Sequence, residues 1–513
     1  MRQDLNLALA ELFQQLNATC TNACESGIGG DEAFRIKTGR IIKGRIIKMQ
    51  LLTSQHIISI IATLLLVTVF GIYSGKKVKT SSDFAVGGKK ANWPIIAGTI
   101  IGTLVGGSST IGTAQMAYLY GFSAWWFTLG GGIGCLILSI FFTEPLWLTG
   151  AKTVPEIISK EFGGRTSVCS SIFSSLGIFL NIISQVLAIT ALFSTVFNLK
   201  PLISAVIGVF LMANYVIFGG VWGTGLIGVL KTVLLYTSMI IAGLLAYTMG
   251  GGISGFREVF PAFPWFSLFG RGFLTDFAAG FSLVIGVLAT QTYIQAVISG
   301  KDVRSSKIGS MISAILVVPI GLAGIFIGLF MRNNFPNIDP GKAFPLFVLK
   351  YLNPWIGGVV LATLIIAVVG TGAGLALGVS TVLTNDIYKR YLNKTADDKN
   401  LLKVSRILIV AVLGITLLFV YGNLGSLILQ WAILSMGLRG TAALIPMIPA
   451  LFFKGKVTKK AGFLCVLLGP ISVLLWKIFF PDIGEPLYIG LLVGVLILFL
   501  GGLANKKDKT KAM

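Results

Sequence analysis

The chain has 513 residues, of which 55% are hydrophobic and only 12% are charged, and its mean hydropathy is +0.87. Soluble folds carry about a quarter charged residues, so this composition excludes them and places the chain in a bilayer. The 41 basic and 19 acidic residues give a net charge of +22, but the basic residues lie in short connectors between apolar runs, which argues against a nucleic-acid partner.

Continuous apolar runs of about twenty residues divide the sequence, and each is long enough to cross a bilayer as a helix. A membrane β-barrel is excluded, because its strands would be shorter and would alternate in polarity. About thirteen transmembrane helices are expected on this template. In chain order they start near Ile57, Ile95, Phe122, Ser167, Pro201, Leu226, Leu274, Ile308, Ile356, Lys403, Leu427, Lys460 and Pro486. The predicted fold class is an all-α polytopic membrane protein.

Lys and Arg are unevenly divided between the connectors. Those after the odd-numbered helices, together with the C-terminal tail, carry 24 Lys and Arg, against 7 in the other connectors. Because cytoplasmic loops are enriched in Lys and Arg, we expect the first set to lie inside. The chain is then a multi-pass protein of the inner (plasma) membrane, with its N-terminus outside and its basic tail, residues 505–513, in the cytoplasm.

The first 48 residues conflict with this topology, because they carry seven Lys and Arg on the predicted outer side. We interpret residues 1–48 as a basic extension and expect translation to begin at Met49, whose uncharged start would cross a membrane easily. The transmembrane domain would then cover residues 49–504. A peptide from residues 2–30 in the mature protein would rule this interpretation out.

The span Ile95–Gly121 is rich in glycine and small hydroxyl residues and is a poor continuous helix. Broken helices free backbone carbonyls that can bind a cation at mid-membrane depth, so such a span is a candidate site. Gly98, Gly102 and Gly106 are spaced four apart, which fits close helix packing equally well. The GGSST segment that starts at Gly106 favours a functional break.

A second glycine cluster lies in the span Ile365–Tyr391, with Gly370, Gly372 and Gly374 around Thr371. A threonine hydroxyl beside carbonyls freed by glycine is a suitable ligand for a hard monovalent cation. The alternative is that Thr371 bonds back to its own helix turn, as Ser and Thr often do.

Charged residues inside membrane spans are rare and are functional by default. Lys231 lies about one turn from the predicted cytoplasmic end of its span, so we expect its side chain to reach the membrane surface. Glu144 and Asp276, near helix ends, would do likewise. Arg439 lies midway along its span: it either clamps backbone carbonyls or faces a cavity and receives an anionic solute group.

Groups for enzyme chemistry are scarce. The single histidine, His56, precedes the first apolar run and is expected to be an interfacial side chain, and the five cysteines are scattered. A nucleophile, a base and an orienting group do not occur together, so the sequence predicts neither an enzyme nor a cofactor.

Five segments resemble elements of the sodium:solute symporter family. In chain order they are SSDFAVGGKKANWP (Ser81–Pro94), TVPEIISKEFGGR (Thr153–Arg165), FGGVWGTGLIGVLK (Phe218–Lys231), QTYIQAVISGKD (Gln291–Asp302) and VLTNDIYKR (Val382–Arg390). Each is weak alone. Five in the family's order, within a match spread over residues 57–500, identify the chain as similar to that family.

The resemblance implies the LeuT-type fold, in which two five-helix inverted repeats contain discontinuous helices; here the repeats would cover residues 95–249 and 274–452. It also implies a sodium site between the first of these spans and the one that contains Thr371. Its ligands would be the carbonyls of Gly102, Val105 and Ala367 and the hydroxyl of Thr371, with Gly370 in place of the family's preceding hydroxyl residue. The glutamine that the family places in its GG-x-x-A helix falls on Lys231.

The resemblance further implies a secondary active transporter that imports a small organic solute by sodium-coupled symport and alternating access, functional as a monomer in the bilayer. The expected solute contacts are Ser108, Ser109, Gly286, Gln291 and Arg439. Arg439 would favour a carboxylate-bearing solute, such as an amino or organic acid. Because Gly370 removes one sodium ligand, a proton-coupled or uncoupled carrier of the same fold stays open, as does a non-transporting membrane solute sensor.

Overall fold

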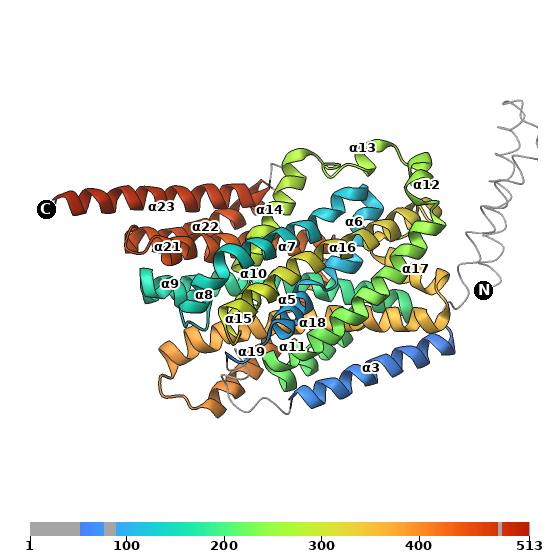
Figure 1. Cartoon of the computed structure of the whole chain (residues 1–513), viewed down its shortest axis with the longest axis horizontal. Coiled ribbons are helices and arrows are strands. Elements are labelled where there is room, and N and C mark those ends of the chain that lie inside the picture. Colours follow the sequence, from blue (N-terminus) through green and yellow to red (C-terminus); the bar gives the residue numbers. More distant parts are fainter. Residues whose placement is uncertain (1–51, 76–88, 481–484, 512–513) are drawn as a thin grey trace, which may run out of the picture. The chain divides into compact units, whose positions relative to one another are not determined.

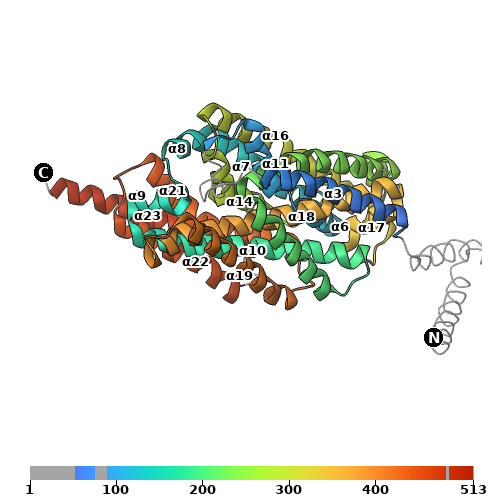
Figure 2. The ribbon, with the colours of Figure 1, turned by 90° about the horizontal axis from the view of Figure 1, so that it is seen from below.

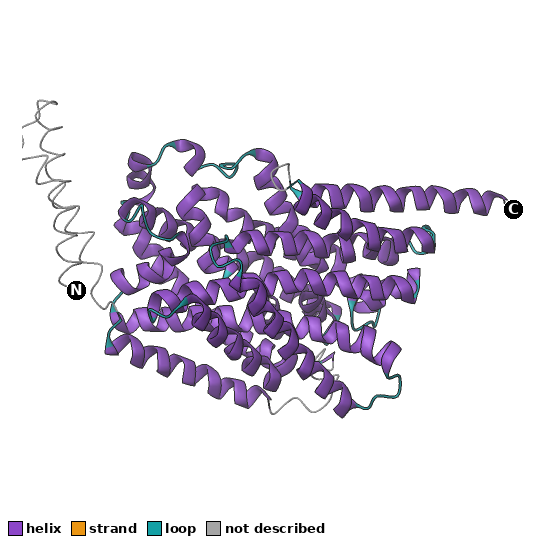
Figure 3. Ribbon diagram, turned by 180° about the vertical axis from the view of Figure 1, so that it is seen from behind, coloured by secondary structure: helices purple, strands orange, loops and turns teal. Residues whose placement is uncertain are grey.

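The computed structural model describes residues 52–75, 89–480 and 485–511. Figure 3 shows helices throughout this part of the chain and no strand. An isolated bridge joins Ala91 to Gly300, with hydrogen bonds from Ala91 N to Ser299 O and from Lys301 N to Ala91 O, both 3.0 Å long. The predicted extension 1–48 and the first eight residues of the motif that starts at Ser81 lie outside the described residues.

The first half of the helical unit begins with α3 (Ser54–Gly75), which precedes the first expected repeat. That repeat contains α5 (Trp93–Leu104), η3 (Ser108–Gly112), α6 (Thr113–Tyr120), η4 (Gly121–Trp125), α7 (Trp126–Ile137), η5 (Leu138–Phe142), α8 (Thr143–Leu148), α9 (Val154–Phe162), α10 (Gly164–Val196) and α11 (Pro201–Met249). The short helices α12 (Gly252–Val259) and α13 (Ala262–Trp265) follow it.

The second expected repeat contains α14 (Phe273–Ala289), α15 (Gln291–Ile298), α16 (Val303–Asn334), η6 (Pro340–Lys342), α17 (Ala343–Tyr351), α18 (Pro354–Val382), η7 (Leu383–Leu392), α19 (Asp398–Tyr421), α20 (Ile428–Arg439), η8 (Gly440–Leu444) and α21 (Ile445–Phe452). Two helices come after it, α22 (Lys459–Phe479) and α23 (Pro486–Lys511), and they pack along each other (Figure 1).

Nine helices in the described part are long and apolar enough to cross a membrane, or ten if the bent pair α14 and α15 counts as one span. Shorter apolar helices cover Ser54–Val69, Trp93–Leu104 and Pro201–Ile217. The all-α membrane fold is thus confirmed, whereas the count of thirteen spans stays a prediction.

The two spans predicted to start at Pro201 and near Leu226 fall within one helical element, α11. Within this element, Pro201–Ile217 and Gly228–Met249 are two separate apolar stretches, so the expectation of two spans stays a prediction. Between the two predicted starts the sequence contains glycine but neither proline nor a charged residue, so nothing in it forces the backbone hydrogen bonding of the helix to stop.

The predicted interruption after Ile95 is present. Helix α5 ends at Leu104, Val105 adopts an extended conformation (φ −93°, ψ 95°), and the chain resumes as a π-helix at Ser108. The predicted interruption around Thr371 is absent, because α18 runs without a break from Pro354 to Val382. Its glycines serve packing instead: a Cβ at Gly372 would lie 2.5 Å from the sulfur of Met212 on α11.

A further break, which the sequence did not reveal, separates α14 from α15 at Thr290. The two helices are bent by 46°. Thr290 has extended backbone angles (φ −80°, ψ 119°), and no glycine or proline marks the position. Each expected repeat therefore begins with a discontinuous helix.

Helix α5 lies at the centre of the helical unit, in contact with α11, α15, α16 and α18 (Figure 1). Helix α3 runs alongside α18 and α11 (Figure 2). Helix α11 approaches α5 closely at Gly228, where a Cβ would lie 2.2 Å from the Gly98 carbonyl oxygen. Glycine is therefore required at position 228. Of the two alternatives for Gly98, a functional break or close helix packing, this contact supports close packing.

Three polar side chains near helix ends were expected at the membrane surface. Glu144 is exposed and pairs with Lys307 at 2.7 Å. Asp276 is buried and pairs with Arg271, also at 2.7 Å. His56 is buried, 1% exposed, and packs at Gly357 of α18. The predicted surface position therefore holds for Glu144. It is wrong for Asp276 and His56, because Asp276 is paired with Arg271 inside the fold and His56 packs against α18.

Candidate cation and solute site

The break in α5 is lined by groups that satisfy its freed backbone. Gln185 on α10 accepts a hydrogen bond from the Gly107 amide at 2.8 Å, and its own amide donates to the Ser108 hydroxyl at 2.9 Å. Unsatisfied backbone groups at membrane depth cost several kcal/mol each. The break is stable here because neighbouring helices supply these partners.

Thr371 of α18 faces the other side of this break. Its hydroxyl lies 3.2 Å from the Gly102 carbonyl oxygen and 3.3 Å from that of Val105. A Cβ at Gly106 would lie 2.5 Å from the Thr371 hydroxyl oxygen, so glycine at 106 allows the approach. Thr371 therefore bonds across to α5, and the alternative of a bond within its own turn is not observed.

Lys231 of α11 reaches the same oxygens. Its Nζ donates to the Gly102 carbonyl, to the Ala367 carbonyl at 2.8 Å and to the Thr371 hydroxyl at 3.0 Å. The side chain is 1% exposed. The expectation that Lys231 reaches the membrane surface is wrong, because the contact of Gly228 with α5, one turn earlier, directs this part of α11 toward the break.

Gly370 lies beside the lysine side chain. A Cβ at this position would lie 3.4 Å from the hydroxyl oxygen of Tyr215 and 3.7 Å from Cδ of Lys231. Gly370, which lacks the hydroxyl of the family pattern, and Lys231, which replaces its glutamine, are therefore neighbours in the structure. Both departures from the family pattern were visible in the sequence, but their adjacency was not, because the two positions are 139 residues apart in the chain.

Two of the expected solute contacts follow the break. Ser108 lies 3.0 Å from the hydroxyl of Ser184, and Ser109 donates to the Leu104 carbonyl at 3.0 Å. Both side chains are buried. Ser109 therefore closes a π-type turn, while Ser108 belongs to a polar cluster with Ser184 and Gln185.

Arg439, at the end of α20, is fully buried at the second break. Its guanidinium donates to the Thr290 hydroxyl at 2.7 Å and to the Ser435 carbonyl at 3.2 Å, and it also lies 2.7 Å from the sulfur of Met436. Gly286 lies in the same place, where its Cβ would meet that sulfur at 2.1 Å. Arg439 and Gly286 are thus brought together, with Thr290 as a neighbour that the sequence reasoning missed.

The Gln291 side chain does not join Arg439 and Gly286, because its hydrogen bonds go to other residues. Its side chain accepts from the Val154 amide at 2.9 Å and donates to the Lys152 carbonyl at 3.1 Å. Beside it, the Thr153 hydroxyl donates to Asp386 at 3.1 Å. Three of the family-like motifs therefore meet here, at the connector between α8 and α9.

A small polar cavity of about 240 Å³ lies near the start of α20. Its lining includes Gln115, Thr190, Asp339 and Lys342. Next to it, Gln115 accepts from the Ile428 amide at 3.0 Å, which ties α6 to α20.

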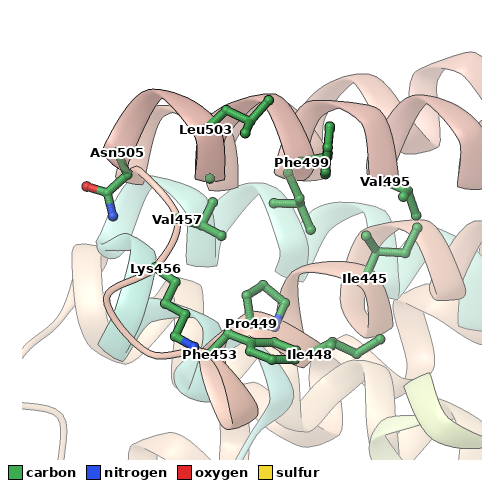
Figure 4. A pocket seen from close by; sticks show the side chains of 12 residues that line it. Ile445, Ile448, Pro449, Phe453, Lys456, Val457, Val495, Phe499, Leu503 and Asn505 are labelled. Carbon is green, nitrogen blue, oxygen red and sulfur yellow. The ribbon is translucent and has the colours of Figure 1, made fainter. Parts of the chain in front are cut away.

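A larger cavity, of about 660 Å³, lies between α21 and α23 (Figure 4). Apolar side chains such as Ile445, Phe453 and Phe499 line it, and its polar side chains are Lys456 and Asn505. It lies between α21, the last element of the second expected repeat, and α23, which follows both repeats. With so few polar groups it is poorly suited to orient a polar solute.

No group of three or more His, Cys, Asp or Glu side chains that could hold a metal ion occurs in the described part of the chain. The ligands available at the α5 break are carbonyl and hydroxyl oxygens, which suit a hard cation such as sodium.

Residues 84–469 match the model of the sodium:solute symporter family. The chain is 24% identical over 473 residues to the sodium/glucose cotransporter of Vibrio parahaemolyticus, covering 82% of this chain and 84% of that one. It is also 24% identical over 437 residues to the sodium/proline symporter of Salmonella typhimurium, covering 80% and 85%.

Among solved structures, a Na⁺-coupled sialic acid symporter in its substrate-bound outward-open state matches with a TM-score of 0.73. The two sequences are 17% identical, and the match covers 88% of this chain and 98% of that one. This match confirms the predicted LeuT-like fold.

Proposed function

The chain belongs to the sodium:solute symporter family, and from that premise we propose that it imports a small organic solute by alternating access, with the coupling cation held between the α5 break and α18. Family membership makes the chain a membrane transporter and not an enzyme. Sodium-coupled symport of a small solute is its general function, as the sequence predicted. The solute, the site residues and the orientation are the parts proposed here.

The contact of Thr371 with the carbonyls of Gly102 and Val105 carries the proposal. The three residues are buried, and the Thr371 hydroxyl lies within 3.3 Å of each of the two carbonyl oxygens, which belong to the end of α5 and the residue after it. A cation that binds them joins α5 to α18, so its binding favours the conformation in which the helices meet. A ligand shifts a conformational equilibrium only through such a difference in affinity.

Contacts on either side of the site support alternating access. Gln115 and Ile428 connect α6 to α20, and Gln291 connects α15 to the start of α9 and to Lys152 before it. Each contact is a hydrogen bond between a side chain and a backbone group. Opening one side of the transporter requires breaking one of these connections while the other holds.

The first experiment is a solute screen on the purified protein in detergent, with sodium chloride or choline chloride. A solute that binds the folded state raises the apparent melting temperature. We expect at least one solute to stabilise the protein, and more strongly in sodium. If solutes raise the melting temperature but none of them accumulates in proteoliposomes under an inward sodium gradient, the chain is a solute sensor and the proposed transport is wrong.

Arg439 supports a carboxylate-bearing solute. Guanidinium groups bind carboxylates through paired, charge-assisted hydrogen bonds, and the described partners of Arg439 are a hydroxyl, a carbonyl and a sulfur, none of them negatively charged. We expect Arg439→Gln to weaken solute binding at least tenfold and Arg439→Lys to weaken it less. Unchanged solute binding in Arg439→Gln would mean that Arg439 instead stabilises the fold by binding backbone carbonyls.

The chain is a multi-pass membrane protein, and we place it in the plasma membrane as a monomer, with the C-terminus inside and the N-terminus outside. The Lys and Arg distribution supports this orientation. A cysteine introduced at Lys454, in the exposed turn between α21 and α22, should be inaccessible to an impermeant thiol reagent in intact cells. Labelling from outside would reverse the topology.

A proton-coupled carrier of the same fold is the second candidate. The observation that favours it is the position of Lys231, whose Nζ lies among the proposed cation ligands.

A further inference from the structure

The gap between α21 and α23 widens toward the end of α23. Near the middle of α23 the two helices touch, because a Cβ at Gly494 would lie 2.9 Å from the Ile445 side chain. About two turns later, a Cβ at Gly502 would meet nothing nearer than the Lys456 carbonyl oxygen, at 3.8 Å. Helix α23 stays packed on α22 over the same turns. It therefore diverges from α21, and the cavity of about 660 Å³ lies in the gap.

This cavity is open on its outer side, and most of its lining is hydrocarbon. Of its lining side chains, Phe499 is 63% exposed, Val495 55% and Leu503 48%. Proteins leave few voids larger than a water molecule unfilled, and a cavity holds water only where polar groups can bind it. These side chains offer no such group. Because α23 is long and apolar enough to cross a membrane, a lipid acyl chain is the occupant that fits this gap.

The polar groups of the cavity gather at one end (Figure 4). Lys456 lies there with its Nζ 5.6 Å from the centroid of the Phe453 ring, and Asn505 donates to the Gly455 carbonyl at 2.9 Å. The carboxylate of Glu161 accepts from the Gly455 amide at 2.5 Å. Lys456 is exposed and forms no ion pair with a carboxylate of the described residues. Its charge is therefore available to an anion from outside the protein.

Further lysines surround this end of the cavity. Lys454, Lys459 and Lys460 are exposed on the connector and the start of α22, and the sequence of α23 continues with Lys506 and Lys507. The proposed topology places this end of the spans in the cytoplasm. Anionic lipids of the cytoplasmic leaflet are attracted to such clusters, and basic pockets between transmembrane helices bind their headgroups.

From this arrangement we propose that the cavity between α21 and α23 is a binding site for one anionic phospholipid. An acyl chain lies along Phe499 and Val495, and the headgroup phosphate pairs with Lys456. The apolar length of the cavity selects an amphiphile, and the lysine selects a negative headgroup. The site uses helices other than α5 and α18, so this inference does not rest on the proposed coupling cation or on the solute.

The test is native mass spectrometry of the full-length protein in neutral detergent, titrated with dioleoyl phosphatidylglycerol or with dioleoyl phosphatidylcholine. The two lipids have the same acyl chains, and only the first has a net negative charge. A lysine near a membrane surface changes the affinity for an anionic lipid about fivefold, so we expect one phosphatidylglycerol to bind at least that much more tightly. Lys456→Gln should remove this preference. Lys454→Gln changes an exposed lysine of the same turn that does not line the cavity and should keep it.

Gly502→Leu tests the part of the site that would hold the acyl chain. The leucine side chain would enter the cavity, and its Cβ would meet no atom nearer than 3.8 Å, so the helix can accept it. We expect weaker binding of both lipids. Glycerol 3-phosphate, which has the phosphate but no acyl chain, should not displace phosphatidylglycerol.

Thermal unfolding gives a second readout, because a ligand of the folded state raises the apparent melting temperature. Phosphatidylglycerol should raise it more in the wild type and Lys454→Gln than in Lys456→Gln and Gly502→Leu. Both lysines are exposed, so their comparison stands whether or not Gly502→Leu folds.

Equal binding of the two lipids by the wild type would overturn the proposal, as would unchanged binding in a folded Gly502→Leu. Equal losses in Lys456→Gln and Lys454→Gln would also overturn it, because a general attraction to a basic surface would explain the binding. Displacement by glycerol 3-phosphate would assign Lys456 to a free anion instead. A wild-type dimer that dissociates in Gly502→Leu would make this face an interface between two copies of the chain, again against the proposal. Solute accumulation in proteoliposomes is measured separately, so none of these results decides the transport function.

Discussion

The α5 break and the middle of α18 are two glycine-rich stretches that face each other, yet only one of them is broken. At the break, Gln185 binds the freed Gly107 amide, and Thr371 and Lys231 bind the freed carbonyl of Gly102. In α18, the glycines allow side chains of neighbouring helices to pack closely, and the hydrogen bonds of the helix continue without a break. The difference shows that glycine permits a break, and that partners from other helices are what stabilise it.

The largest effect is expected where a side chain would enter the contact between the two stretches. Gly106→Ala places a Cβ 2.5 Å from the Thr371 hydroxyl and 2.6 Å from the Gln185 amide oxygen. Neither neighbour is free to move, so we expect solute accumulation in proteoliposomes to fall at least tenfold.

The matched control is Gly372→Ala on α18, where the nearest atom is the sulfur of Met212, also at 2.5 Å. A methionine side chain adapts readily, so most of the transport should remain. Equal losses in both variants would mean that the break is no more sensitive than ordinary helix packing.

A smaller effect is expected from removing the hydroxyl that joins the stretches. Thr371→Val leaves the Val105 carbonyl without its described donor and removes one acceptor of the Lys231 ammonium. An unsatisfied buried polar group costs about 1–3 kcal/mol, so the apparent melting temperature should drop by several degrees.

Thr363→Val is the control for this change. Thr363 is buried on the same helix, but its hydroxyl bonds back to the Val359 carbonyl at 2.8 Å. That carbonyl keeps its helical donor, so the melting temperature should change little. A larger loss in Thr363→Val than in Thr371→Val would contradict the role given to the contact between α5 and α18.

The smallest effect is expected from Ser109→Ala, which removes one hydrogen bond to the Leu104 carbonyl within the break. A typical hydrogen bond contributes about 0.5–1.5 kcal/mol. Ser313→Ala on α16, whose hydroxyl bonds to Gly309 in an intact helix, should cost less. Thermal unfolding of the two variants side by side would show whether the break depends on its own hydroxyls.

The sequence was sufficient for the class of fold, and it singled out the residues of the proposed cation site. Apolar runs of membrane length, the GGSST segment and Thr371 pointed to α5 and α18, and the structure brings Gly102, Val105, Ala367 and Thr371 together. Local composition carries that information, because glycine and hydroxyl residues are unusual in the middle of a membrane span.

Contacts between distant helices were not predictable in the same way. Nothing near Lys231 in the sequence indicates that the contact of Gly228 with α5 directs its side chain into the site. The break at Thr290 was missed because it has no glycine or proline and depends on Arg439, 149 residues away. Gln291 was assigned to the solute, whereas its polar atoms bind the backbone around Val154.

The most direct test of the central claim is a structure of Lys231→Gln in sodium by electron cryomicroscopy, at a resolution that shows ordered ions. The account predicts one ion where the lysine nitrogen lies in the wild type, bound by the carbonyls of Gly102 and Ala367 and by the Thr371 hydroxyl. An intact α5 break with no ion among those oxygens would contradict it.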